Sequence, residues 1–582
     1  MSSETPDLRS IRNPTPGDKA DRQGPVIAYF SMEVGLDASI PTYSGGLGAL
    51  AADSLRSAAE IGIPMVGVTL LYRKGHFRQH LDNLGNQTES PVDWDPAYHM
   101  EKMETRARIS IEGRQVVIRP WRYTVKSERG KDVPLYFIDT GLPENDPWDR
   151  ALTDSLYGGD DRYRLGQEIV LGIGGVAILR ALGYNDVTAY HMNESHSALL
   201  TIALLDEETK RTGKPLTSRE NVDRVRERCV FTTHTPVPAA IDKFPSDLVA
   251  RMLSSSTTGA LSDLGCMVGQ TLNMIYLALA LSRYINGVSM RHEEISRDMF
   301  PSSPINSITN GVHAVTWTSD AFAELYDRYV PEWRADNFYL RYAIRIPLDE
   351  ILAAHLTAKR ALLDEVERDG TDLDPDVMTI GFARRMTQYK RPALLFSNIA
   401  RLKSINSNAG RIQIICAGKA HPRDESGKDV IRQIHSAIER LRGNIKVVFL
   451  EEYNLALGKL MCSGADLWLN TPQAPYEASG TSGMKAALNG VPSFSVMDGW
   501  WEEGHVEGVT GWSIGEPNGA SSLEQEIESL YSKLEKTIVP MFYSSTGAYR
   551  NVMRAAIAIN GSYYNSHRMM MQYLDHAYMP GT

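Results

Sequence analysis

The chain has 582 residues, of which 42% are hydrophobic and 23% are charged, and its formal net charge is −10. These values are typical of a large globular protein with more than one domain. The negative charge argues against nucleic acid as a main partner, and no apolar run is long enough to predict a membrane span.

Residues 1–24 are polar and rich in proline, which predicts a flexible leader without the apolar segment of a signal peptide. The four cysteines are scattered and lack CxxC spacing. We therefore expect reduced thiols in the core and a cytoplasmic location. The cysteines are Cys229, Cys266, Cys416 and Cys462.

Short apolar segments alternate with helical patterns from residue 26 onward. Residues 108–125 alternate between polar and apolar and predict an antiparallel excursion. Helices are expected at 52–62 and 163–183, among others. The expected strands of this first series are 26–33, 65–72, 135–141, 187–193, 229–235 and 305–312.

A second series of strands begins near residue 378, with segments at 378–385, 412–420, 445–453, 465–472 and 491–499. Two successive series predict an α/β fold with two doubly wound, Rossmann-like domains that face a cleft. We expect the first domain at 25–325, the second at 326–545, and a helical segment at 546–582 that packs back across the junction.

The segment EASGTSGMKAALNG, residues 477–490, combines a glycine-rich turn with one lysine. Gly480, Thr481 and Ser482 can present N–H groups and hydroxyls to a phosphate at the start of a helix. Lys485 lies just inside that helix, where burial and the positive helix end lower the pKa of a lysine. This pairing suits an aldehyde cofactor that carries a phosphate. On spacing alone, an ordinary turn with a solvated lysine stays an alternative.

The segment GFARRMTQYKRP, residues 381–392, follows a buried strand directly. It holds Arg384, Arg385, Lys390 and Arg391, with Tyr389 among them. Four cations in one short loop repel one another unless an anion lies among them. A solvated basic turn is the alternative, but the position after a buried strand favours anion binding.

The segment GGLG at residues 45–48 precedes a helix. Gly45, Gly46 and Leu47 can bring backbone N–H groups close to an anion, although a tight turn between strand and helix would have the same sequence.

Polar residues follow three further strands of the first series. His234 ends the segment CVFTTHT, and a histidine in such a place is more often a hydrogen-bonding group than a catalytic one. Asn193, Glu194 and His196 suit core support and sugar contact equally well. Asn310 has the reach to bond sugar hydroxyls.

Taken in order, these motifs resemble those of the α-glucan (glycogen, starch, maltodextrin) phosphorylases of the compact bacterial type. The segment 477–490 is similar to the family's pyridoxal-phosphate lysine pattern EASGTxxMKxxLNG, and 381–392 is similar to KRxxxYKR. The chain departs from better-known members at Ser482 and Gly483, where they have Gly-Asn, and at Ala239, where a glutamate follows the proline that aligns with Pro238.

The resemblance implies pyridoxal 5'-phosphate bound to Lys485 as a Schiff base, with its phosphate near Gly480, Thr481, Ser482 and Arg384. It implies a catalytic set of Lys485, Arg385, Lys390 and His234, in which Arg385 and Lys390 bind the substrate phosphate and His234 touches the glucosyl unit. No metal is expected in the site. The residues implied in substrate binding are Gly45, Gly46, Leu47, Tyr389, Asn310, Glu477, Ser479 and Gly480.

The implied reaction is retaining phosphorolysis of α-1,4-glucan by inorganic phosphate to α-glucose 1-phosphate, with the cofactor's phosphate group as proton donor and acceptor. A glycosidase would need two carboxylates, whereas these motifs supply cations and one acid. Two alternatives stay open: a nucleotide-sugar-dependent glucan synthase of the same fold, and a catalytically impaired glucan-binding homologue. Members are often dimers, so a homodimer is a further expectation.

Overall fold

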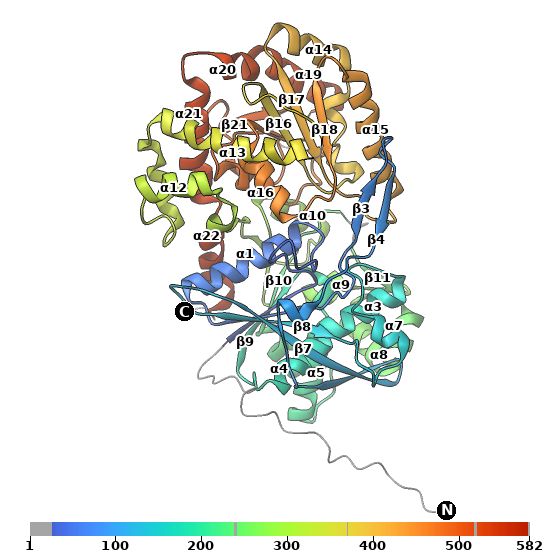
Figure 1. Ribbon diagram of the computed structural model, residues 1–582. Coiled ribbons are helices and arrows are strands. Elements are labelled where there is room, and N and C mark those ends of the chain that lie inside the picture. Colours follow the sequence, from blue (N-terminus) through green and yellow to red (C-terminus); the bar gives the residue numbers. More distant parts are fainter. Residues whose placement is uncertain (1–25, 238–240, 369, 517–520, 580–582) are drawn as a thin grey trace, which may run out of the picture.

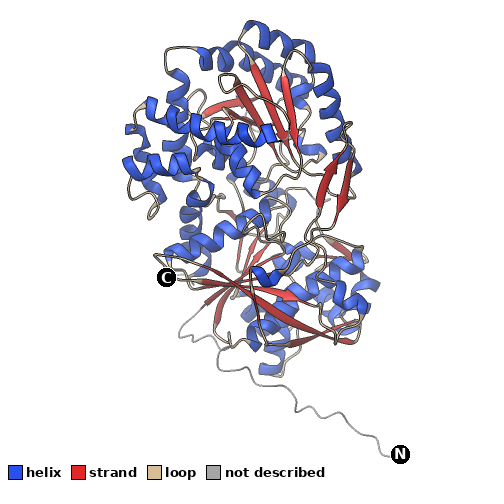
Figure 2. Ribbon diagram, in the orientation of Figure 1, coloured by secondary structure: helices blue, strands red, loops and turns tan. Residues whose placement is uncertain are grey.

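The computed structural model describes residues 26–237, 241–368, 370–516 and 521–579. The predicted leader, Pro238 and Ala239 lie outside the described residues. Figure 1 shows two lobes, with residues coloured blue to green in the lower one and yellow to orange in the upper one. Each lobe has a twisted sheet with helices packed around it (Figure 2). The predicted α/β class with two largely parallel sheets is confirmed.

The first sheet has the strand order β15-β14-β10-β9-β1-β2-β8-β7-β5, with β6 paired to β7. Its strands run parallel from β8 to β15, while β5, β6 and β8 are antiparallel to β7. The predicted antiparallel excursion is therefore confirmed. The bounds are β1 Val26–Ser31, β2 Met65–Leu70, β5 Glu101–Lys102, β6 Ala107–Ile111, β7 Arg114–Val125, β8 Val133–Asp139, β9 Val187–Asn193, β10 Cys229–Thr232, β14 Tyr284–Gly287 and β15 Ile305–Ser307.

The second sheet is parallel throughout, in the order β18-β17-β16-β19-β20-β21. Every residue of β16 and β17 is buried, which explains their continuous apolar character, since helices cover both faces of a parallel sheet. The sequence analysis missed β14 and β21, which have only four residues each. The bounds are β16 Met378–Ala383, β17 Ile412–Ala417, β18 Lys446–Leu450, β19 Leu467–Asn470, β20 Ser493–Val496 and β21 Gly511–Ile514.

The helices follow the expected pattern, with one interruption. The helix predicted at 163–183 is α3 (Asp161–Ile169) and α4 (Gly175–Ala181), joined by a π-helical turn at Val170–Gly174. A Cβ on Gly172 in that turn would lie 2.6 Å from the backbone nitrogen of Leu200, so the glycine permits a close approach of the chain. The other helices of the first lobe are α1 Gly46–Ile61, α2 Pro147–Ala151, α5 Leu200–Thr212, α6 Arg219–Arg226, α7 Ser246–Met252, α8 Ser255–Asp263, α9 Met274–Ala280 and α10 Met290–Met299.

Residues before 325 already belong to the hydrophobic cluster around the second sheet. Val312, Trp317 and Leu325 are members of this cluster, so the predicted end of the first domain at 325 lies after the chain has joined the second core. The exact domain limits stay a prediction. The remaining helices are α11 Ala314–Trp317, α12 Asp320–Tyr329, α13 Leu348–Arg368, α14 Ile399–Asn408, α15 Glu425–Leu441, α16 Leu455–Gly464, α17 Ser482–Ala487, α18 Trp501–Gly504, α19 Leu523–Lys533, α20 Val539–Tyr543, α21 Ala548–Ala555 and α22 Ser566–Tyr573.

The last helices run from the upper lobe to the lower one (Figure 1). Helix α22 lies against α1, where the hydroxyls of Ser57 and Ser566 are 2.6 Å apart. Arg568 of the same helix donates to the carbonyl oxygens of Thr309 and Asn310. The chain therefore crosses between the lobes more than once.

A hairpin forms a further connection between the lobes. Strands β3 (Arg78–Leu81) and β4 (Gln87–Ser90) leave the first lobe and reach the second on the right of Figure 1. Gln87 both donates to the carbonyl of Ala420, at 2.8 Å, and accepts from its N–H, at 3.0 Å. Gln79 donates to the carbonyl of Gly418 at 2.9 Å. We call residues 78–90 the bridging hairpin.

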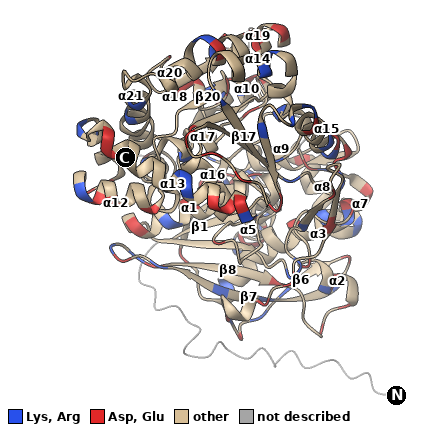
Figure 3. Cartoon of the chain, turned by 45° about the horizontal axis from the view of Figure 1, so that its top comes forward, with Lys and Arg blue, Asp and Glu red and all other residues tan. Residues whose placement is uncertain are grey.

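The surface mixes both signs of charge, as Figure 3 shows for outer helices such as α12 and α15. All four cysteines are buried and unpaired, as predicted. Among the described residues no helix is both long and apolar enough to cross a membrane.

Candidate active site

The predicted site residues come from loops and helix starts that follow the carboxyl ends of strands in both sheets. The lobes are joined there by direct contacts: Ser289 Oγ donates to the carbonyl of Ala478 at 2.6 Å, and the hydroxyl of Tyr43 accepts from the N–H of Leu455 at 2.8 Å. The cofactor-type segment and the GGLG segment therefore lie at one junction.

Lys485 lies on the short helix α17 and is only 9% exposed. Its Nζ is 3.5 Å from the centroid of the Trp317 ring. Burial lowers the pKa of Lys485, and the carboxylate of Asp53 opposes this shift only in part. A buried amine with a lowered pKa and an aromatic face against it is the environment in which a lysine becomes a nucleophile.

Asp53 holds Trp317 in this position. Its Oδ2 accepts from Trp317 Nε1 at 2.8 Å and from the N–H of His313 at 3.1 Å. The sequence analysis missed both Asp53 and Trp317. The available signal was that Asp53 lies two helical turns after Gly46 and thus on the same face of α1.

Glu477 pairs with two of the predicted cations. Lys390 Nζ lies 2.7 and 2.9 Å from its two carboxylate oxygens, and Arg384 Nη2 lies 2.5 Å from Oε2. Burial would raise the pKa of Glu477, but Lys390 and Arg384 outweigh it and hold the value at about 2. Glu477 is therefore ionised at neutral pH, and its backbone N–H donates to Asp498 at 2.8 Å.

Arg384 uses only part of its guanidinium in this pair. Its Nε and Nη1 are buried and have no hydrogen-bond partner among the described residues. The same is true of the hydroxyl oxygen of Ser479 and the side-chain oxygen of Asn310. Unsatisfied buried polar groups are costly, so their concentration here indicates a place for a polar ligand.

Arg385 is exposed and has no carboxylate within ion-pair distance among the described residues. Although the residue as a whole is exposed, desolvation of its guanidinium would lower its pKa; Tyr389 and Glu33 overcome that effect, and the pKa is raised. Burial would raise the pKa of Tyr389, yet Lys390 and the arginines bring it below its ordinary value. Arg385 is thus a free cation beside residues of the first lobe.

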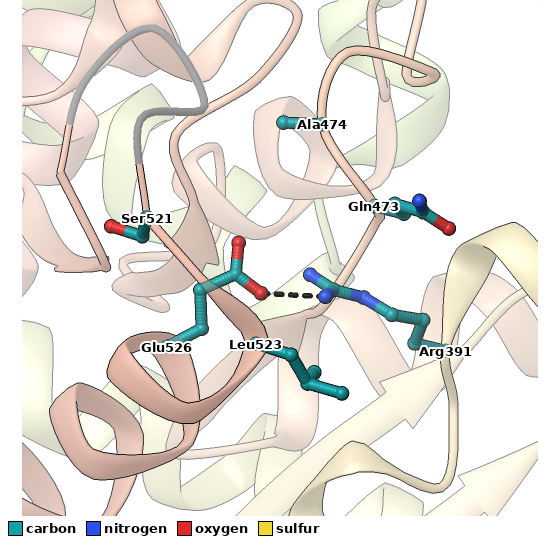
Figure 4. A pocket seen from close by; sticks show the side chains of 6 residues that line it. All are labelled: Arg391, Gln473, Ala474, Ser521, Leu523 and Glu526. Atoms are coloured by element: carbon teal, nitrogen blue, oxygen red, sulfur yellow. Dashed lines mark ion pairs between the residues drawn. The ribbon is translucent and has the colours of Figure 1, made fainter.

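Arg391 corrects the expectation that all four cations share one anion site. Its backbone has a φ of 44°, and its guanidinium is directed to Glu526 and to the carbonyls of Thr471 and Pro472. Figure 4 shows the guanidinium of Arg391 facing the carboxylate of Glu526 in a small cavity of its own. Of the four cations in this loop, Arg384, Arg385 and Lys390 therefore remain candidates for an anion site.

The GGLG segment has a carboxylate beside it. Gly45 N–H donates to Glu33 Oε2 at 3.1 Å, and the hydroxyl of Tyr157 donates to Glu33 Oε1 at 2.9 Å. A Cβ on Gly48 would lie 2.8 Å from Glu33 Oε2, so this glycine is needed for the close approach. Gly46 and Leu47 begin α1 behind this contact. Glu33 is a second residue that the motif analysis missed.

The turn before Lys485 has a backbone conformation that favours glycine at one position. Gly480 has a φ of 82°, a conformation that favours glycine. Thr481 makes no capping hydrogen bond, whereas the hydroxyl of Ser482 accepts from Trp468 Nε1 at 3.0 Å. A Cβ on Gly483 would lie 2.8 Å from both Ser493 Oγ and Trp500, which explains the departure from the family pattern.

The first lobe contributes neutral groups. His234 Nε2 lies 2.7 Å from Asn193 Oδ1, and its backbone N–H donates to Glu194 at 2.8 Å. Burial lowers the pKa of His234 to about 3, so the ring is uncharged at neutral pH. His196 is likewise buried, with its pKa lowered to about 4. The side chains of His234 and Asn193 are therefore joined directly. A role of His234 in sugar contact stays a prediction.

The sequence matches the carbohydrate phosphorylase family over residues 35–143 and 258–503, more than half of the chain. These ranges contain the GGLG segment, the cation loop and the Lys485 segment, while His234 lies between them.

Three relatives extend the match across 95% of the chain. A maltodextrin phosphorylase of Thermococcus litoralis is 38% identical, with 70% of its length covered. A glycogen phosphorylase of Aquifex aeolicus is 33% identical, with 86% covered. An uncharacterized protein of Methanocaldococcus jannaschii is 29% identical, with 99% covered. With these motifs placed together at one junction between the lobes, the chain belongs to the carbohydrate phosphorylase family.

Proposed function

We propose that the protein is an α-1,4-glucan phosphorylase that transfers the terminal glucosyl unit to inorganic phosphate, with retention at the anomeric carbon. The observation that carries the proposal is the cation cluster of Arg384, Arg385 and Lys390, in which Arg384 and Lys390 are buried against Glu477 and Arg385 is exposed. The cluster lies at the junction that also holds Lys485 and the GGLG loop. The names of the maltodextrin and glycogen phosphorylases among the relatives support an α-glucan as the substrate.

Pyridoxal 5'-phosphate fits the residues present. Lys485 is a buried amine with a lowered pKa, suited to a covalent link with an aldehyde. A phosphate could accept hydrogen bonds from Nε and Nη1 of Arg384, which have no partner among the described residues. It could also bond the side chain of Thr481, the N-cap residue of α17, which makes no capping hydrogen bond. When bound, the group would supply a phosphate that titrates near pH ~6 and can both give and accept a proton. Ser482 is the weakest member of the predicted set, because its hydroxyl already bonds Trp468.

The chain's own residues would hold the substrate phosphate and the sugar. Arg385, which has no carboxylate partner among the described residues, would bind the phosphate with its two-pronged guanidinium, and Lys390 would add a point charge. Together they would stabilise negative charge near the developing positive charge of the sugar. The N–H groups of the loop from Gly45 to Leu47 would bind the phosphate once the carboxylate of Glu33, which accepts from Gly45 N–H, moves away from them.

The remaining predicted residues would position the glucan. His234, Asn310 and Ser479 offer neutral donors and acceptors of the kind that bond sugar hydroxyls. Glu477 is ionised at neutral pH and cannot donate a proton. Burial raises the pKa of Asp498 to about 7, but its oxygens accept from the N–H groups of Glu477 and Gly499. No pair of free carboxylates therefore supports hydrolysis among the described residues of the site.

The test is phosphate-dependent release of glucose 1-phosphate from a ladder of maltooligosaccharides. Borohydride reduction followed by peptide mass mapping should add a pyridoxyl group at Lys485. A glucan synthase would instead consume a nucleotide sugar and would need no cofactor on Lys485. A glucan-binding homologue without activity would bind maltodextrin yet release no glucose 1-phosphate.

We also propose a cytoplasmic location, which four unpaired buried cysteines support because free thiols persist in reducing compartments. A homodimer stays a prediction.

A further inference from the structure

Two histidines and one glutamate meet in a cluster outside the site described above. Glu60 lies in the last turn of α1, His313 caps α11, and His567 lies in α22. Their side-chain donor atoms all lie within 4.8 Å of one another. The three residues come from distant parts of the chain, so no local motif announces the cluster, and the sequence predicted no metal.

The cluster has the donor chemistry of a transition-metal site. His567 Nε2 is 2.6 Å from Glu60 Oε2, and His313 Nε2 is 3.1 Å from Glu60 Oε1. Two imidazole nitrogens and a carboxylate form a common ligand set for Zn²⁺, which leaves a fourth position for water. The side chain of Glu60 is 25% exposed, so an ion can reach the cluster from solvent.

His313 is the most buried of the three residues in the cluster. Its side chain is 4% exposed, and its Nε2 is buried without a hydrogen-bond partner among the described residues, although Glu60 is near. Its other ring nitrogen, Nδ1, lies 2.7 Å from the hydroxyl of Thr316 and 3.3 Å from the backbone nitrogen of the same residue. In the tautomer that donates Nδ1–H to the hydroxyl, as metal-bound histidines typically do to such an oxygen, Nε2 is left free to coordinate.

We propose that Glu60, His313 and His567 bind one divalent transition-metal ion of the zinc class. The ion would tie α22 of the C-terminal segment to α1 of the first lobe and to the turn that leads to Trp317. It would act as a structural clamp between segments far apart in the chain, because a metal that binds the folded state alone stabilises it. The proposal is independent of the reaction proposed above.

The experiment uses the full-length protein without an affinity tag, stripped with a chelator and kept in phosphate-free buffer. Zn²⁺ alone is titrated by calorimetry, and Co²⁺ alone is titrated by its visible d–d absorption. We expect one ion per chain and a higher midpoint of thermal unfolding with Zn²⁺. Absence of stoichiometric binding to the unaltered protein would overturn the proposal.

Two ligand variants and one control locate the site. Glu60→Gln and His567→Asn should each weaken binding by about 10–100-fold or more. His576→Asn is the matched control, since His576 lies near the same end of the chain, has a side chain that is 54% exposed, and has Asp575 as its one ion-pair partner among the described residues. If His567→Asn fails to fold, Glu60→Gln carries the test, because glutamine keeps the size of the side chain. Equal affinity in Glu60→Gln and His576→Asn would place the ion elsewhere and refute the site.

Discussion

The two sides of the junction between the lobes differ in the side chains that they place there. On the side of the second sheet, Arg384 and Lys390 hold the buried carboxylate of Glu477, and Lys485 is buried against Trp317. On the side of the first sheet, His234 is an uncharged ring bonded to an amide. We call the side with Arg384, Lys390 and Lys485 the charged face, and the group of His234 and Asn193 the neutral face. The charged face suits phosphate groups and the neutral face suits sugar hydroxyls, although the first lobe also places the carboxylate of Glu33 at the junction.

Removal of Lys485 should have the largest effect on the charged face. Lys485→Ala should abolish covalent cofactor and nearly all release of glucose 1-phosphate, because no other buried amine faces Trp317 among the described residues. Circular dichroism should show an intact fold. Lys459→Ala, on the partly exposed α16, is the control and should keep its activity. Retained activity in Lys485→Ala would remove the cofactor from the proposal.

Arg385 tests whether the free cation binds phosphate. Arg385→Ala should cost ~2–4 kcal/mol of transition-state stabilisation, as removal of a donor to a developing anion does, and should raise the phosphate requirement. Arg385→Lys should recover only part of the lost stabilisation, because lysine restores the charge but not the two-pronged guanidinium. The measurement is kcat/KM for phosphate at fixed glucan.

The control for Arg385 is Arg442→Ala, since Arg442 is exposed and, in the part of the chain that the structure describes, forms an ion pair with Glu439 alone. Unchanged phosphate kinetics in Arg385→Ala would assign phosphate binding to other residues.

Glu477 tests the pairing on the charged face through pH. Its pKa of about 2 in the folded protein is below the ordinary value of 4.5, so its ionisation stabilises the fold above pH 4.5, and this contribution is lost as pH falls through 2. The shift corresponds to about 3 kcal/mol. Glu477→Gln cannot titrate, so it should lose less stability than the unaltered protein between about pH 5 and pH 3. Denaturant unfolding at both pH values checks this, and an identical loss would contradict the pairing.

His234 tests the neutral face and should show the smallest effect. His234→Ala should raise the barrier to turnover on glucan by about 1–2 kcal/mol, since it removes a hydrogen-bonding ring and the contact that this ring makes with Asn193 Oδ1. Cofactor content should stay unchanged. The exposed His80 on the bridging hairpin gives the control, His80→Ala. Normal turnover in His234→Ala would make this histidine a structural residue.

Local patterns predicted the parts of the molecule that local chemistry determines. The buried parallel strands were visible as continuous apolar runs, and the turn at Gly480 as a position that needs glycine. The short strand β21 was missed, whereas β10, β19 and β20, which also have four residues each, were predicted. The π-helical turn was missed because packing against Leu200, rather than helix propensity, explains it.

The site was predictable to the extent that its residues share one segment. Lys485 and Arg385 lie in recognisable loops, whereas Asp53 and Trp317 act on Lys485 only after the lobes assemble. Arg391 was misjudged for the same reason, since its partner Glu526 is far away in the sequence. Pairing of charges across the fold decides which cation remains free, and no spacing rule contains that information.

The bridging hairpin restricts how the two lobes can move. Gln79 and Gln87 bond the backbone of the second lobe on one side of the molecule, and α22 joins the lobes on the other (Figure 1). Because both flanks are tied, separation of the lobes would break several hydrogen bonds at once, and only small rotations cost little. The bridging hairpin and α22 therefore act as two fixed edges, and any motion that opens the junction is expected to be a rocking between them.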